Sequence, residues 1–186
     1  MRRCSVISLR IRNTHRTCLK QLVLAVFGML TTSACATSRI GEAEVRQIDG
    51  VPCFTIPIKE EQRAGGAPRL SALSVYDAST APTTEIWSFA SPFAKMPTLS
   101  SDVCIPYGRA PTGSETTKSI PLQVGKKYGV ILNTVRVDPS DPTFAYDARF
   151  CLVANPNGGV RVQQVIYSNG WRYEACEAQK SGALTE

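Results

Sequence analysis

Residues 145–154 read AYDARFCLVA, and this stretch decides the fold class of the chain. Every second side chain is apolar, and these side chains would share one face of an extended strand. The members of this face are Tyr146, Ala148, Phe150 and Leu152. A period of two predicts a half-buried β-strand rather than a helix. Cys151 is out of phase, and we expect it to point to the opposite side.

Outside this stretch, the rest of the chain contains further segments that are rich in Val, Ile, Tyr, Phe and Trp, a composition that predicts β-strands. The expected strands are Glu44–Asp49, Val51–Lys59, Leu70–Asp77, Glu85–Ala90, Val103–Tyr107, Lys127–Val137, Ala145–Ala154, Val160–Tyr167 and Trp171–Cys176. No window beyond residue 40 shows a helical period. The charged pair Glu60-Glu61 is expected to lie in a solvated loop that ends at Arg63-Ala64-Gly65-Gly66.

Shared faces and turns join these strands into a sandwich. Further apolar faces combine Phe54, Ile56 and Ile58; Val103, Ile105 and Tyr107; and Trp171, Tyr173 and Ala175. Residues 155–159 (NPNGG) and 168–170 (SNG) predict hairpin turns, so the last three strands would form a meander. Leu122, Gly125 and Tyr128 resemble the turn before a fibronectin-like strand, where a tyrosine packs at a corner. A core tyrosine after a simple turn is the alternative. The expected fold is all-β, an immunoglobulin-like or fibronectin-like β-sandwich.

The first 34 residues form a secretory signal peptide by their pattern. A basic segment precedes the nine apolar residues Leu22–Leu30, and small residues follow at 31–36. Nine residues are too few to span a bilayer, which needs about 20. A buried helix of a cytosolic protein is the alternative interpretation. The long basic segment also leaves the true start codon open.

Two cleavage modes fit the end of this signal. Residues 32–35 (TSAC) resemble a bacterial lipobox with Thr32 in place of the usual Leu, which would make Cys35 the lipidated N-terminus. Residues 34–36 (ACA) also fit ordinary signal peptidase. We expect lipidation, because a cysteine here is otherwise unexplained. Ala36 after the cysteine, by resemblance to enterobacterial lipoproteins, implies the inner leaflet of the outer membrane. Residues 35–41 would be a tether, 42–178 the sandwich and 179–186 a disordered tail.

Four of the seven cysteines remain in the mature domain, an even number that implies two disulfides in an exported protein. They are Cys53, Cys104, Cys151 and Cys176. Each is out of phase with the apolar face of its strand, so we expect the bridges near strand ends or on an outer face. The outer strands of a meander lie about 9.6 Å apart, beyond the roughly 7 Å reach of a disulfide. This disfavours Cys151–Cys176. We expect Cys53–Cys151 with Cys104–Cys176; Cys53–Cys176 with Cys104–Cys151 is the alternative.

Charge and histidine content exclude several functions. The formal charge of the chain is +6, but six of its 21 basic residues and none of its 15 acidic residues precede Cys35. The mature part is therefore neutral, with no bulk charge for nucleic acid. The single histidine, His15, leaves with the signal peptide. Ser-His-Asp and Cys-His catalysis and imidazole-based zinc sites are then excluded. We expect no enzymatic activity, cofactor, metal or small-molecule substrate.

Two remaining clusters have structural interpretations. Asp138 and Asp141 flank prolines and predict a plain turn rather than a calcium loop. An aromatic and proline cluster is expected to cover the core under a long loop, and an exposed patch for a partner is the alternative. Its members are Trp87, Phe89, Pro92, Phe93 and Pro97.

Five motifs resemble, in order, a family of small proteobacterial lipoproteins described as periplasmic immunity proteins of type VI secretion. They are residues 51–57 (VPCFTIP), 87–88 (WS), 104–108 (CIPYG), the Leu122/Gly125/Tyr128 turn and residues 146–151 (YDARFC). The resemblance covers about residues 42–151 and rests on cysteines, core aromatics and turn residues. It implies a periplasmic, lipid-anchored protein that binds an effector toxin and occludes it, with no catalytic residues. The alternative is a structural or accessory envelope lipoprotein whose sandwich is a protein-interaction module.

Overall fold

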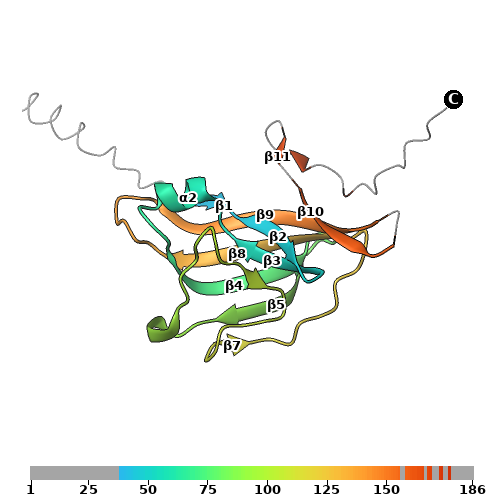
Figure 1. Ribbon diagram of the computed structural model, residues 1–186, viewed down its shortest axis with the longest axis horizontal. Coiled ribbons are helices and arrows are strands. Elements are labelled where there is room, and N and C mark those ends of the chain that lie inside the picture. The colour runs from blue at the N-terminus through green and yellow to red at the C-terminus, as the bar shows by residue number, and fades with distance from the viewer. Residues whose placement is uncertain (1–37, 156–157, 166, 169–171, 174–175, 177–186) are drawn as a thin grey trace, which may run out of the picture. The chain divides into compact units, whose positions relative to one another are not determined.

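The computed structural model describes residues 38–155, 158–165, 167–168, 172–173 and 176. The predicted signal peptide, Cys35 and the tail at 179–186 lie outside these residues. The described chain is mostly β-structure in two packed sheets, so the predicted all-β sandwich is confirmed (Figure 1).

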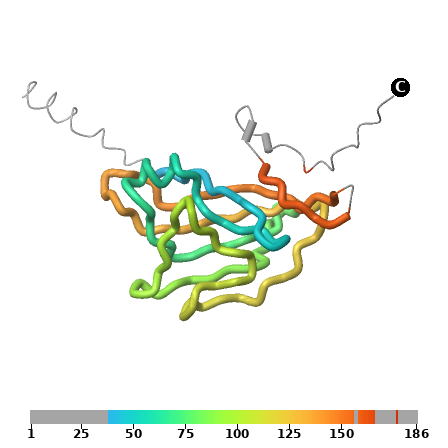
Figure 2. Tube along the Cα trace, in the orientation of Figure 1, coloured from blue at the N-terminus to red at the C-terminus, as the bar shows by residue number. Residues whose placement is uncertain are grey.

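The larger sheet has seven strands in the order β1-β9-β8-β4-β5-β7, with β10 also paired to β9. Its strands are β1 (Arg39–Glu42), β4 (Arg69–Asp77), β5 (Thr84–Ala90), β7 (Glu115–Thr116), β8 (Lys127–Val135), β9 (Thr143–Ala154) and β10 (Val160–Val165). The twelve-residue strand β9 has β8 along one edge. The other edge pairs with β1 in parallel and then with β10 in antiparallel orientation. Figure 2 shows the blue β1 beside the orange β9, although about 100 residues separate them.

The smaller sheet contains β2 (Glu44–Ile48), β3 (Val51–Thr55) and β6 (Ile105–Pro106). Only Ala43 separates β1 from β2, so the chain passes from the larger sheet to the smaller one at this buried residue. The Ala43 N–H donates to the Asp147 carbonyl over 2.8 Å. Residues 39–41 were expected to be part of a tether; that was wrong, because the edge of β9 offers them backbone partners.

The core lies between the sheets. The alternation of apolar residues along β9 determines which of its side chains the larger sheet contributes to the core. Tyr146, Ala148, Phe150 and Leu152 are all buried, as predicted. The Phe150 ring contacts Phe54 of the smaller sheet at a centroid distance of 5.6 Å. Ile58 and Val103 were predicted to belong to apolar strand faces, and this was wrong. Their side chains are 56 % and 62 % exposed, because β3 ends at Thr55 and β6 begins only at Ile105. Trp171 and Ala175 lie outside the described residues, as does the side chain of Tyr173.

Tyr128 confirms the corner interpretation of the turn before β8. Its side chain is buried, and its hydroxyl accepts a hydrogen bond from the Gln123 N–H over 2.7 Å. A tyrosine at the start of a strand that bonds to backbone a few residues upstream is the tyrosine corner of β-sandwiches. Gly125, at φ +82°, supplies the left-handed turn that brings these residues together.

The expected disulfide pairing was wrong. The bridges are Cys53–Cys104 and Cys151–Cys176, with Cα–Cα distances of 5.5 and 5.8 Å. The meander that excluded the second bridge does not form, because β11 (Tyr167–Ser168) and β12 (Arg172–Tyr173) pair with each other in a separate two-stranded sheet. Cys176 can therefore lie beside β9 and bond to Cys151. The expected location holds: Cys151 packs outside the core with Val153 and Val165, and Cys104 precedes β6.

Two glutamines join the sheets along one side. Gln164 of β10 accepts from the Val45 N–H over 2.8 Å and donates to the Ala43 carbonyl over 3.0 Å. Gln47 of β2 makes the reciprocal contacts, donating to the Val160 carbonyl and accepting from the Val162 N–H. Each side-chain amide thereby replaces one peptide unit of a missing neighbour strand. Strand edges that would otherwise expose backbone groups are covered in this way.

Removing the Gln164 amide tests this closure. Gln164→Leu leaves the Val45 N–H and the Ala43 carbonyl without partners, and it should lower the free energy of unfolding by about 1–2 kcal/mol. Urea denaturation measures this value. The neighbouring Gln163→Leu is the matched control and should change it by less than about 0.5 kcal/mol. Equal effects of both substitutions would contradict the closure.

Removing one disulfide tests the pairing. Cys53 and Cys104 are 51 residues apart, so Cys53→Ala/Cys104→Ala should lower the free energy of unfolding by about 4 kcal/mol through the entropy of the unfolded chain. The other bridge, with a separation of 25 residues, should contribute about 3.5 kcal/mol. Peptide mapping without reductant checks the pairs directly, and a peptide joining Cys53 to Cys151 would contradict them.

Candidate functional site

The predicted aromatic cluster does not form a site. Trp87 and Phe89 are buried in the core, where the Trp87 ring meets Tyr107 edge-on at 5.2 Å. Phe93 instead is 67 % exposed and carries the Arg69 guanidinium 4.4 Å above its ring. The prediction that these aromatic residues cover the core is therefore confirmed for Trp87 and Phe89 and wrong for Phe93.

The aspartates of the β8–β9 connection make turns, as predicted. Asp138 accepts hydrogen bonds from the backbone N–H and the hydroxyl of Ser140, both over 2.7 Å. Asp141 does the same for Thr143. In each aspartate, Oδ1 accepts from the backbone and the hydroxyl of the residue two positions further along, which is typical of a capped turn.

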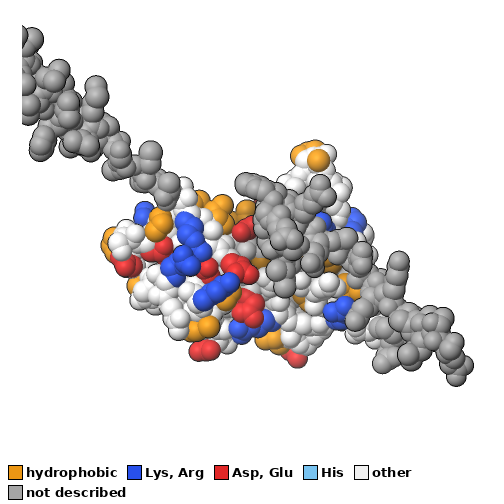
Figure 3. Space-filling model, turned by 90° about the horizontal axis from the view of Figure 1, so that it is seen from above, with side chains coloured by type: hydrophobic (Ala, Val, Ile, Leu, Met, Phe, Trp, Pro, Cys, Tyr) orange, Lys and Arg blue, Asp and Glu red, His pale blue; other side chains and the backbone are white. Residues whose placement is uncertain are grey.

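A surface depression beside the helix α2 (Ile58–Arg63) is lined by four elements, three of which contribute charged side chains. We call it the charged groove. It is lined by Arg39, Ile40, Gly41, Glu42, Lys59, Glu60, Arg63, Asp147, Ala148, Arg149, Gln164 and Val165. Figure 3 shows basic and acidic side chains together on the face seen from above. The chain beyond residue 34 is neutral overall, yet four cations and three carboxylates meet here.

Glu60 was expected to be in a solvated loop, and this was wrong. The helix α2 begins after Pro57, has acidic residues in its first turn and Arg63 in its last, and precedes Gly65. These are helix start and stop signals, although six residues are too few to establish a helical period. Because the helix packs on the sandwich, the Glu60 side chain is only 3 % exposed.

The buried Glu60 carboxylate is held by a bidentate pair with Arg39. Both nitrogen–oxygen distances are 2.7 Å, and Arg39 also donates to the Thr143 hydroxyl over 2.9 Å. The Arg39 guanidinium lowers the pKa of Glu60, against the effect of burial. Two parallel charge-assisted bonds are the strongest form of such a pair. The pair joins the β1 edge to α2.

Gly41 makes room for this arrangement. A Cβ at this position would lie 2.5 Å from the Tyr146 ring and 2.9 Å from a Glu60 carboxylate oxygen. Tyr146 is itself buried, and burial raises its pKa to about 12, so its hydroxyl is neutral at physiological pH. The backbone at Gly41, which lines the groove, is thus closely packed against a neutral phenol.

Other charged side chains of the groove lie close to groups of opposite charge or to an aromatic ring. Lys59 of α2 pairs with Glu42 of β1 over 2.5 Å. Burial raises the pKa of Asp147, with Arg149 acting against this and Glu42 adding to it. The Arg149 guanidinium lies 4.7 Å from the Tyr76 ring centroid. The Arg149 side chain passes over Gly129, where a Cβ would lie 2.2 Å from an Arg149 nitrogen.

This arrangement suits recognition of a polar surface. Its side chains supply paired guanidinium, ammonium and carboxylate groups, which give specificity to charged contacts. Within the described residues, no group of three or more His, Cys, Asp or Glu side chains could hold a metal ion. Nor does any helix in the described part combine the length and apolar character needed to cross a membrane.

No family model, curated protein or solved structure matches the chain. The predicted lipidation residue Cys35 lies outside the described part of the chain.

Acidification combined with substitution tests the Arg39–Glu60 pair. A lowered carboxylate pKa contributes stability that is present above about pH 4.5 and is lost as the pH falls through the lowered value. Arg39→Met should therefore cost about 2 kcal/mol at pH 7, where Glu60 is left charged and buried. Below pH 4 the difference from the original chain should shrink, because Glu60 is neutral in the variant.

The matched control is Arg46→Met. Arg46 forms a similar bidentate pair with Glu44, but both side chains are about one-third exposed. Its loss should change the free energy of unfolding by less than about 0.5 kcal/mol at either pH. Urea titrations at pH 7 and pH 3.5 measure all of these values. Equal effects of the two arginine substitutions would show that burial of Glu60 does not strengthen its pair.

Proposed function

We propose that this protein is a periplasmic immunity lipoprotein that binds a type VI secretion effector and neutralises it by occlusion. The motif resemblance supplies the class of partner. The two disulfides indicate an oxidising, extracytoplasmic compartment, which is where such an effector would be met.

The observation that carries the binding role is the fixed position of the charged groove. Helix α2 is attached in two directions, by Glu60 to Arg39 and by Glu61, whose carboxylate accepts from the Ser101 N–H over 2.6 Å. A surface that is ordered before binding loses little conformational entropy when a partner docks. A stoichiometric inhibitor benefits from this rigidity.

The strand order supports an immunoglobulin-like ancestry as part of the same proposal. In that fold one sheet holds strands A, B and E, and the other holds G, F, C and C′. Here β2-β3-β6 and β9-β8-β4-β5 follow the same order along the chain. The tyrosine corner on β8 lies on the equivalent of strand F. Sandwiches of this type serve widely as binding modules, but fold alone does not assign a partner.

A lipid on Cys35 would keep this domain close to the membrane. Strand β1 begins at Arg39, four residues further along. Four extended residues span at most about 14 Å. In the proposal, the outer-membrane anchor therefore holds the binding domain directly at the membrane surface, rather than on a long flexible arm.

Survival in co-culture tests this function. Cells that lack the gene should be killed by sister cells that deliver the effector, and the full-length gene should restore survival. A version without residues 2–34 should not protect, because it is neither exported nor oxidised. Cys35→Ser distinguishes the anchor from the binding role, since it should retain partial protection if it is still exported.

Equal survival of cells with and without the gene would contradict the immunity proposal. A stable complex with an envelope assembly, isolated without any protective effect, would instead favour the accessory-lipoprotein alternative.

A further inference from the structure

One end of the sandwich combines exposed apolar side chains with exposed cations. Strand β9 runs from this end, at Thr143, to the opposite end, at Ala154, a length of about 36 Å for its twelve residues. Strand β1 begins at the Thr143 end, because Arg39 is in register with Thr143. We call this the β1 end; it comprises β1, α2, the 3-10 helix η1 (Phe93–Lys95), the β8–β9 connection at 136–142 and the start of β9. It lies on the left in Figure 1.

Five large apolar side chains of the described chain are 42 to 67 % exposed at the β1 end. They are Ile40, Ile58, Phe93, Val137 and Phe144. Contacts connect the segments that carry them. A Cβ at Gly66, just after α2, would lie 3.8 Å from Cγ1 of Val137. Arg69 is in register with Val135 of β8 and donates to the Phe93 carbonyl. The apolar side chains therefore belong to neighbouring parts of one surface.

Exposed positive charge exceeds exposed negative charge among these segments. The exposed cations are Lys59 and Arg63 of α2, Lys95 of η1, and Arg136 beside Val137. The exposed carboxylates are Glu42, which pairs with Lys59, and Asp138, which accepts hydrogen bonds from Ser140. Four cations thus face two carboxylates. Within the described residues, Arg63, Lys95 and Arg136 take part in no ion pair.

The Ala154 end lacks this combination. The turns there also expose three apolar side chains, those of Ile48, Val124 and Val160. The cations beside them are half-buried, and they are Lys126, Lys127 and Arg161. Lys126 also pairs with Asp77 over 3.0 Å. The two ends therefore differ in accessible positive charge more than in apolar character.

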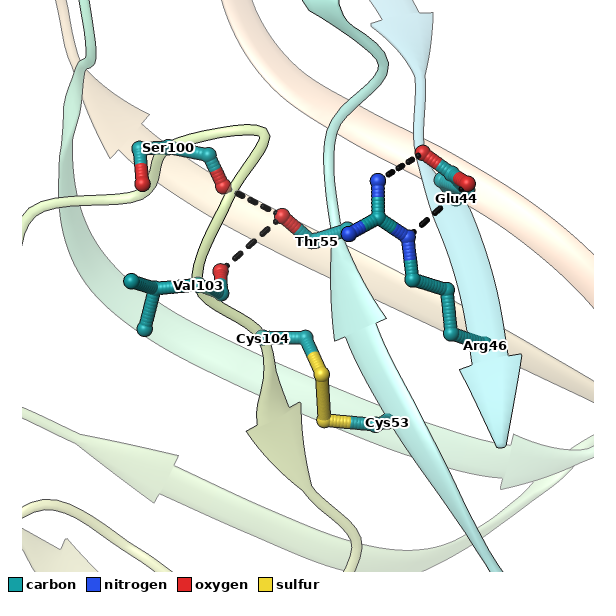
Figure 4. The surroundings of a disulfide bond; sticks show 7 residues. All are labelled: Glu44, Arg46, Cys53, Thr55, Ser100, Val103 and Cys104. Atoms are coloured by element: carbon teal, nitrogen blue, oxygen red, sulfur yellow. Dashed lines mark hydrogen bonds and ion pairs between the residues drawn. A yellow bond between two sulfur atoms is a disulfide. The ribbon is translucent and has the colours of Figure 1, made fainter. Parts of the chain in front are cut away.

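The β1 end presents its side chains from a fixed frame. Glu61 of α2 accepts from the Ser101 N–H over 2.6 Å. The loop that contains Ser101 is in turn attached to β3 by the Cys53–Cys104 disulfide and by the Thr55 hydroxyl, which donates to loop carbonyls (Figure 4). A surface that is already ordered loses little conformational entropy when it docks.

The chain enters the domain at this same end. Arg39 is four residues after Cys35, and four extended residues span at most about 14 Å. A lipid on Cys35 would therefore keep the β1 end close to the bilayer, whereas the Ala154 end lies about 36 Å away along β9. A short tether gives the attached surface a high effective concentration at the membrane.

We propose that the β1 end is a membrane-docking surface, which rests on a phospholipid bilayer that contains anionic headgroups. Its apolar side chains enter the interfacial layer, and its cations contact lipid phosphates. Buried apolar area and attraction to anionic lipid are the two contributions that hold a peripheral surface on a bilayer. The proposal rests on the lipoprotein part of the proposed function and not on the effector. The charged groove continues along β9 to Arg149 and Val165, away from the β1 end, and stays open to a partner.

Quenching by lipid tests this docking. Full-length protein is purified from membranes, and its mass is measured to verify the acyl groups on Cys35. It is then reconstituted into vesicles of phosphatidylethanolamine and phosphatidylglycerol with brominated acyl chains. A fluorescent amino acid replaces Phe93 in one variant and Ile48, 45 % exposed at the end of β2, in a second. Bromine should quench position 93 at least about twofold more than position 48.

The cations are tested on the same vesicles. Lys95→Gln/Arg136→Gln should lower the quenching at position 93 at least about twofold, because fewer cations attract the anionic headgroups. The matched control Arg109→Gln/Lys118→Gln removes two exposed cations outside the β1 end and should leave the quenching within about 1.2-fold. Vesicles of phosphatidylcholine alone should lower the quenching of the original chain. All variants should keep the original midpoint of urea unfolding.

The outcomes separate membrane docking from the immunity function, because the vesicles contain no effector. Equal or absent quenching at positions 93 and 48, or quenching indifferent to Lys95→Gln/Arg136→Gln, overturns the docking surface. Absence of acyl groups on Cys35 also overturns it, because the tether is then missing. A photoreactive residue at position 93 that crosslinks in cells to protein and not to lipid would assign this end to a protein partner instead. Selective quenching at position 93 without protection in co-culture supports docking and contradicts immunity alone.

Discussion

The bidentate contact between Arg39 and Glu60 is the interaction on which the arrangement of the charged surface depends. It pairs the first residue of β1 with a helix that would have little stability alone, because six residues make less than two helical turns. Since Glu60 is buried, the pair commits α2 to one position on the sandwich. From that position, the adjacent Glu61 reaches Ser101. One ion pair therefore affects both the groove and the loop that contains Ser101.

Other side-chain and covalent links also hold the two sheets, and the charges on their surface, in fixed positions. Gln47 and Gln164 join the two sheets along the edge where β2 meets β10, and the Cys53–Cys104 bond ties the last strand of the smaller sheet to its neighbour. The Cys151–Cys176 bond holds Cys176 beside β9, against the small buried cluster that contains Val153 and Val165. Buried core, side-chain bridges and covalent bonds thus cooperate to keep the exposed charges in fixed positions. Such preorganisation suits a protein that binds rather than one that reshapes itself.

Much of the fold could be predicted because alternation is a local signal. Phe150 and its neighbours at 146, 148 and 152 point inward since a strand has a period of two, whatever lies beside it. Leu122, Gly125 and Tyr128 resemble a fibronectin-like turn, which indicated a corner at Tyr128 and left a simple core tyrosine as the alternative. Helix α2 was missed because six residues cannot display a period of 3.6, although its terminal charges and the following glycine were visible. The groove was missed as a consequence, because it is assembled around that helix.

The sequence by itself determined the all-β class, the apolar face of β9 and the neutral, histidine-free composition of the chain beyond residue 34. These are properties of composition and local order. Only the tertiary structure decided the disulfide partners, the burial of Glu60 and the meeting of β1 with β9. Each of these depends on where the chain returns after a turn: a hairpin that leaves the sheet after Val165 brings Cys176 back to Cys151. No local pattern records that change of direction, because the free energies of alternative strand neighbours differ only through contacts made far along the chain.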